Sequence, residues 1–93
     1  MEVLEKKPEG MAADESVTTL DRIVPPGICR VVMVPARGPI RQRLLAFGFV
    51  PGAVVEAVRT APLGDPVEYR VKGCAISLRK EDARLISVTP GGA

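Results

Sequence analysis

The stretch LLAFGFVPG, from Leu44 to Gly52, holds two of the chain's three aromatic residues, Phe47 and Phe49, on either side of Gly48. A helix that ends in glycine usually places that glycine in the left-handed backbone conformation, where a Cβ atom would be penalised. With Gly48 just past the helix end, Phe47 is the last helical residue and Phe49 folds back onto Leu44 through an apolar contact. The stretch therefore predicts a helix end that is closed by its own side chains.

The residues on either side of this stretch extend the prediction in both directions. Gly38 suits the N-cap and Pro39 the first helical position. Ile40 then shares one apolar face with Leu44 and Phe47, as expected for a helix. After the helix, the pair Pro51-Gly52 predicts a turn into the next strand.

Short apolar and β-branched segments flank the predicted helix and read as strands. The clearest prediction is a hairpin formed by residues 67–71 and 74–78, because Lys72-Gly73 fits a two-residue turn between them. In such a hairpin Val71 faces Cys74, so alternate residues of the two strands share one inner face. The predicted strands are 28–34, 53–60, 67–71, 74–78 and 84–88. The residues expected to have structural roles are Leu44, Phe47, Gly48, Phe49, Pro51, Gly52 and Gly73.

Five short strands with one short helix between the first and second favour a mainly β fold, a small SH3-like β-barrel. Closure of such a barrel would remove exposed edge strands. Thr19 is expected to cap a single turn that carries Leu20 and Ile23 inward, and residues 79–83 form a short helical turn. We expect a disordered acidic leader over 1–16, one domain over 17–89 and a frayed end over 90–93.

The composition argues against several kinds of chemistry. There is no histidine, and the two cysteines, Cys29 and Cys74, belong to no CxxC pair. Zinc sites of the thiolate and imidazole type, and Ser/His or Cys/His catalysis, are therefore excluded. We expect no catalytic residue, no metal ligand and no cofactor, with both cysteines acting as small apolar side chains. No apolar run approaches the roughly 18 residues of a membrane span, so a cytoplasmic protein without direct membrane insertion is expected.

The charge is distributed unevenly along the chain. Residues 1–16 carry two Lys against five Asp or Glu, whereas residues 17–93 carry eleven Lys or Arg against six Asp or Glu. An acidic segment of net charge −3 thus precedes a basic domain of net charge +5. This balance favours an acidic partner, but solubility alone would also produce it.

Two groups of residues are candidates for partner contacts. Arg37, Arg41 and Arg43 cluster at the start of the predicted helix, where they form either a solvated polar face or a docking surface for an acidic partner. In the loop 61–66, Asp65 can cap its own turn. The alternative is that Asp65 and an exposed Leu63 contact a partner.

The segments RLLAFGFVPG and APLGDP, then Gly73 and LRKEDARLISV, in this order and spacing, resemble the FeoA family. The resemblance covers about Thr18 to Val88. It implies an SH3-like fold and a non-catalytic accessory role in bacterial ferrous iron uptake. The implied partner is FeoB, a membrane permease with a cytosolic GTPase domain, which would recruit the protein to the inner face of the membrane. A weak homo-oligomer stays open.

A small nucleic-acid-binding β-barrel is the alternative function, motivated by the basic domain and the barrel geometry. Proteins that bind single strands rely on exposed aromatic side chains on which bases stack. All three aromatic residues of this chain are assigned to the core or to the helix cap. We therefore expect no nucleic-acid partner.

Overall fold

The computed structural model describes residues 17–91, which form one antiparallel sheet with three short helices. The strands are β1 (Thr18–Thr19), β2 (Gly27–Met33), β3 (Val54–Thr60), β4 (Val67–Val71), β5 (Cys74–Leu78) and β6 (Ser87–Pro90). The helices are the 3-10 helix η2 (Leu20–Arg22) and the α-helices α2 (Pro39–Phe47) and α3 (Lys80–Ala83).

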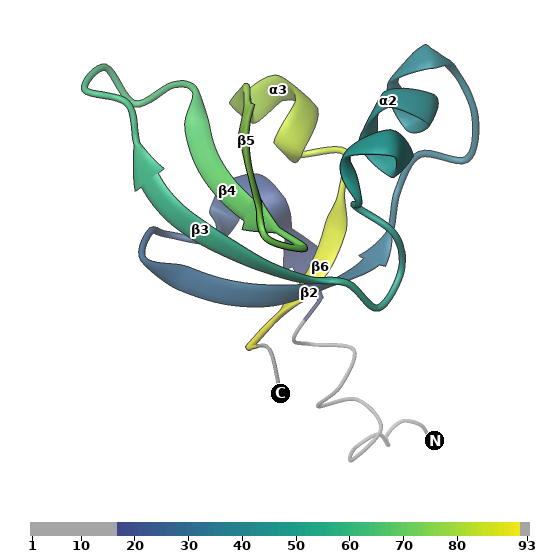
Figure 1. Cartoon of the computed structure of the whole chain (residues 1–93), viewed down its shortest axis with the longest axis horizontal. Helices are drawn as coiled ribbons and strands as arrows, with labels where there is room; N and C mark the ends of the chain where they lie inside the picture. Colours follow the sequence, from purple (N-terminus) through teal and green to yellow (C-terminus); the bar gives the residue numbers. More distant parts are fainter. Residues whose placement is uncertain (1–16, 92–93) are drawn as a thin grey trace, which may run out of the picture.

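The sheet has the order β1-β6-β2-β3-β4-β5 and bends strongly, with α2 and α3 above it in Figure 1. This confirms the mainly β, SH3-like barrel with one helix between its first two long strands. The bend follows from two irregularities, one between β2 and β6 and one between β3 and β4, where the register shifts. Such bulges increase local twist and turn a flat sheet into a curved one.

The structure has six strands where the sequence predicts five. The additional strand, β1, has only two residues, and Thr18 pairs with Val88 while Thr19 pairs with Ser87. Two residues are too few to show an alternating pattern, so the sequence indicated only the turn that follows. That turn is η2, where Leu20 is buried and Ile23 packs against the core.

We expected the strands to close into a barrel, but the backbone hydrogen bonds of the described sheet do not close it. Within residues 17–91 no ladder joins β5 to β1, so the hydrogen-bonded sheet is open and these two strands are its edges. The reason is the shortness of β1, whose two residues both pair with β6. An open sheet leaves β5 with one unpaired side.

The core lies on the concave side of the sheet. Its largest fully buried side chains include Tyr69 and Phe49, whose rings meet edge to face with centroids 6.5 Å apart. Leu44 attaches α2 to this core, and Ile40 and Phe47 pack against it while half-buried. Edge-to-face contact of two rings adds about 0.5–1.5 kcal/mol to their burial.

The hairpin β4–β5 has the predicted register, in which Val71 pairs with Cys74. The predicted burial of Cys74 is wrong, however. Burial declines along β5 from Leu78, which is buried, through the half-buried Ile76 to Cys74, which is exposed at the hairpin end. An edge strand has no neighbour beyond it, so only the end nearest α3 is covered.

The last strand also differs from the prediction. β6 begins at Ser87, because Arg84–Ile86 form the turn after α3, and it continues to Pro90. Pro90 pairs with Cys29, and the Gly91 N–H donates to the Ile28 carbonyl at 2.7 Å. The frayed end predicted from residue 90 is therefore wrong for residues 90 and 91. The predicted leader 1–16 and the final residues 92–93 lie outside the described part.

Candidate functional site

The start of α2 carries the arginines that the sequence singles out. Arg41 turns back along the chain, and its Nη1 donates to the Pro35 carbonyl at 3.1 Å. Its backbone N–H donates to the Gly38 carbonyl, also at 3.1 Å. Arg41 therefore fixes the loop that leads into the helix, and this structural use accounts for its half-buried position.

The other end of α2 is a Schellman motif. The Phe49 N–H donates to the Leu44 carbonyl and the Gly48 N–H to the Leu45 carbonyl, both at 3.0 Å. Gly48 has φ of 105°, a conformation that strains any residue with a Cβ atom. Phe49 is fully buried, so its aromatic ring anchors this end of α2 in the core.

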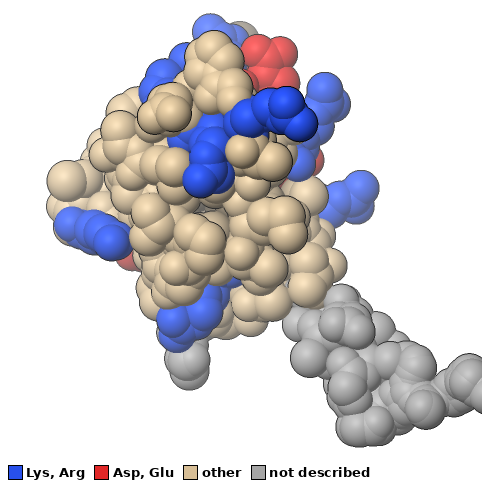
Figure 2. Space-filling view, turned by 90° about the vertical axis from the view of Figure 1, so that its right-hand side faces the viewer, with Lys and Arg blue, Asp and Glu red and all other residues tan. Residues whose placement is uncertain are grey.

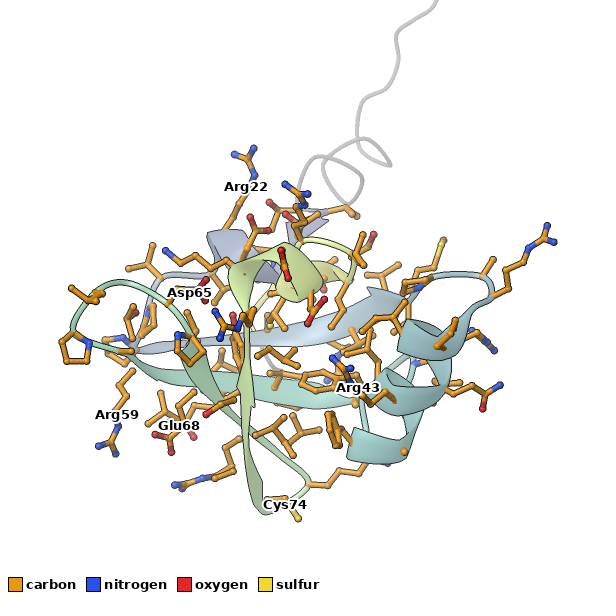
Figure 3. All side chains as sticks on the ribbon, turned by 90° about the horizontal axis from the view of Figure 1, so that it is seen from above. Arg22, Arg43, Arg59, Asp65, Glu68 and Cys74 are labelled. Atoms are coloured by element: carbon orange, nitrogen blue, oxygen red, sulfur yellow. The ribbon has the colours of Figure 1, made fainter. Side chains whose placement is uncertain are left out.

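The four-residue helix α3 contacts one residue from each of the two groups of predicted partner residues. On one side, an Oδ1 atom of Asp65 accepts a hydrogen bond from the Lys80 N–H at 3.0 Å. On the other, Arg43 forms an ion pair of 3.3 Å with Asp82. Figure 3 shows Asp65 and Arg43 on either side of α3.

These contacts change the interpretation of Asp65. It was expected to cap its own turn, but it caps the start of α3, 15 residues further along the chain. The loop 61–66 is closed instead by the Gly64 N–H, which donates to the Ala61 carbonyl at 2.7 Å. The Arg43 side chain remains 57% exposed, so its ion pair contributes less than about 1 kcal/mol.

The remaining two candidates are far more exposed and lie apart. Leu63 is 97% exposed at the tip of the β3–β4 loop, and Arg37 is exposed in the loop before α2. These two loops are at opposite ends of the molecule in Figure 1. The five predicted partner residues therefore do not form one cluster.

The face formed by α2 and its flanking loops is largely uncharged. Figure 2 shows this face from the right-hand side of Figure 1, with Lys and Arg placed around a broad neutral centre and few acidic side chains in view. Met33, the last residue of β2, is 60% exposed beside the loop that leads to α2. The sequence analysis did not predict that Met33 is exposed, because a methionine at the end of an apolar strand is indistinguishable from a core residue.

The interior offers two polar groups with altered ionisation. Burial raises the pKa of the Cys29 thiol to about 11. Burial is also the main cause that raises the pKa of Tyr69, and the nearby Asp21 carboxylate is the second cause. The Tyr69 hydroxyl has no hydrogen-bond partner within residues 17–91. Both groups are held in their neutral forms at physiological pH.

Residues 17–91 give little support for a metal site, a membrane-spanning helix or a surface on which nucleic-acid bases could stack. Residues 17–91 contain no group of three or more His, Cys, Asp or Glu side chains placed to hold a metal ion. In the same range, no helix is long and apolar enough to cross a membrane. Phe49 and Tyr69 are fully buried and Phe47 is half-buried, so the aromatic rings do not form an exposed stacking platform.

The strands, helices and core described above define a small protein of the SH3-like, mainly β class. The sequence profile of the FeoA domain matches residues 18–90, so the chain belongs to the FeoA domain family, which is associated with ferrous iron transport.

Known proteins similar to this chain agree with that assignment. An Fe(2+) transport protein A/Fe(2+) transporter FeoB fusion protein of Porphyromonas gingivalis is 48% identical over 58 residues, which cover 62% of this chain and 7% of the fusion protein. The solution structure of iron(II) transport protein A from Clostridium thermocellum matches with a TM-score of 0.75 and 39% identity, over 81% of this chain and 46% of that one. The FeoA protein of Chlorobium tepidum matches with a TM-score of 0.73 and 33% identity, over 78% and 70% of the two chains.

Proposed function

We propose that this protein is a non-catalytic accessory protein of ferrous iron uptake that binds a FeoB-type permease, or its cytosolic GTPase domain, at the cytoplasmic face of the membrane. The proposal depends on one observation, which is that a relative of this chain is an Fe(2+) transport protein A/Fe(2+) transporter FeoB fusion protein. Fusion of two proteins holds them at a high local concentration, which favours a weak contact between them.

The face over α2 is the proposed docking surface. It includes Arg43 on α2 and Arg37 in the loop that leads into α2, a loop that follows the exposed Met33 at the end of β2. Figure 2 shows a largely uncharged centre on this face. A neutral centre within a charged rim is the usual composition of a protein interface. The positive rim would steer an acidic partner surface toward it. Arg41 and Asp65 support this surface by fixing the α2 loop and the start of α3, and Leu63 is a second proposed contact at the far end.

The test is a titration of the full chain against the cytosolic domain of the FeoB-type permease from the same organism. We expect binding at tens of micromolar or tighter, weakened about fivefold by Arg37→Glu because the rim charge is reversed. Arg22→Glu is the matched control, since it makes the same charge change on η2, where Arg22 is exposed.

Two results would count against the proposal. One is the absence of binding up to about 100 micromolar, which corresponds to an affinity too weak for a specific contact. The other is unchanged iron uptake after deletion of the gene. Equal weakening by Arg37→Glu and Arg22→Glu would contradict the docking face while leaving the partnership intact.

A further inference from the structure

The edge strand β5 presents unpaired backbone groups to solvent. In the hairpin with β4, Val71 pairs with Cys74 across the two-residue turn, where Lys72 has φ of 51° and Gly73 of 84°. This pair exchanges hydrogen bonds, and such pairs alternate with pairs that do not. The backbone N–H and C=O groups of Ala75 and Ser77 therefore point away from β4, on the side where no strand of the described sheet pairs.

Most of β5 lacks the usual protections against pairing, since only its Leu78 end is covered. Natural sheets block an edge with a very short strand, a bulge, a proline or an inserted lysine. The opposite edge, β1, has only two residues. β5 has five residues, a regular register with β4, and the sequence CAISL, which contains no proline and no charge.

The charges at the two ends of β5 select the kind of strand that can pair with it. Lys72 stands before the strand, and Arg79 and Lys80 follow it, all three exposed. Among residues 17–91 none of the three forms an ion pair with an acidic side chain. A strand with acidic residues at its ends would place a carboxylate opposite a cation at both ends.

A second copy of this chain fits the edge poorly. An antiparallel β5–β5 pair centred on Ile76 would bring Lys72, in the hairpin turn of one copy, close to Lys80, the first residue of α3, of the other. Like charges held close together at the ends of a strand pair repel each other. The charge pattern therefore favours a different polypeptide over self-association.

We propose that β5 is a docking site for an extended segment of a partner protein, with acidic residues at both ends, which adds to the sheet as its next strand. The Ala75 and Ser77 backbone groups would bind the segment, as in other cases of strand addition. The exposed Cys74 and half-buried Ile76 would contact its apolar side chains. That this partner is the FeoB-type permease rests on the proposed function.

Ser77→Pro tests the backbone contact directly. Proline removes the outward N–H and places its ring on the edge, and proline is tolerated at edge positions whose N–H faces solvent. Ser77→Ala is the matched control, because it removes the hydroxyl and keeps the N–H. We expect the cytosolic permease domain to bind the Ser77→Ala variant as it binds the natural chain, and Ser77→Pro about tenfold more weakly. Circular dichroism and the melting temperature check that both variants are folded.

A peptide probe separates this inference from the identity of the partner. The natural chain is titrated with a synthetic peptide of about nine residues, with alternating Val and Thr and a Glu at each end. We expect the Ala75 and Ser77 amide protons to exchange about tenfold more slowly in its presence. The same peptide with Lys at both ends should protect neither amide.

The outcomes distinguish the two proposals. Equal binding of the permease domain to Ser77→Pro and Ser77→Ala would overturn the β5 site and leave the proposed function standing. If the domain does not bind the natural chain, the proposed function fails and the peptide decides the β5 site. No protection by either peptide would overturn it, as would equal protection by both. Self-association of the natural chain that Ser77→Pro abolishes would also overturn it, since a second copy would then cover the edge.

Discussion

Replacement of Gly48 by alanine should destabilise the domain through two separable effects. The first is the backbone, because Gly48 has φ of 105° and a Cβ atom in this region costs about 1–2 kcal/mol. The second is packing, because the new Cβ would lie 3.2 Å from Cγ1 of the fully buried Val71. Forcing an extra carbon into a packed core costs about 1–3 kcal/mol. Together they predict a loss of about 2–5 kcal/mol, a large part of the stability of a domain this small.

Gly52→Ala is the control that isolates the packing effect. Gly52 has φ of 91° in the turn after α2, and a Cβ atom there would have nothing within 4 Å. This variant should therefore lose only about 1–2 kcal/mol. Urea unfolding followed by circular dichroism measures both losses, with a slope of about 1 kcal/mol per molar urea expected for a small domain.

The melting temperatures should separate in the same order, by about 4–8 °C for each kcal/mol. Equal destabilisation by Gly48→Ala and Gly52→Ala would refute the packing argument, because it would mean that Val71 moves aside without cost. A loss below about 0.5 kcal/mol in both variants would refute the backbone argument as well.

Three further predictions concern the core, the α3 cap and the two thiols. Leu44→Ala should lower the free energy of unfolding by about 2–5 kcal/mol because Leu44 is fully buried, and a loss below about 1 kcal/mol in urea unfolding would contradict its place in the core. Asp65→Ala should cost about 1 kcal/mol by removing the acceptor of the Lys80 N–H, whereas Asp65→Asn keeps an acceptor and should cost less; equal losses would contradict the cap. At pH 8 a thiol reagent should modify the exposed Cys74 in the folded protein but not the buried Cys29, whose pKa is raised to about 11. Because that pKa lies above the unfolded value of 9.0, the unfolded state loses its proton first, so stability should fall from about pH 9 to 11, and less steeply in Cys29→Ala.

The parts of the fold that sequence reasoning could reach are those encoded over a few neighbouring residues. The end of α2 depends on Leu44, Gly48 and Phe49, which lie within one and a half turns of each other. The β4–β5 register likewise follows from the two-residue turn Lys72-Gly73. The strong bend of the sheet follows from the number and shortness of its strands, so the SH3-like fold could be predicted. The positions of the two register shifts could not.

The parts that sequence reasoning missed depend on residues that are distant in the chain. Asp65 caps a helix that begins 15 residues later, and Arg43 meets Asp82 across 39 residues. Cys74 has the alternation of an inward residue, but its exposure depends on which strand forms the edge. Spacing along a strand gives the direction of a side chain, whereas burial also requires something to cover it.

The pairing of the first strand with the last has a consequence for larger architectures. Thr18 lies opposite Val88 in the β1–β6 ladder, so the polypeptide comes into the domain and leaves it at neighbouring points. A unit with adjacent termini can be spliced into another protein without stretching either connection. This domain can therefore be joined to a much larger protein at either end, or inserted into one, with little change in its own structure.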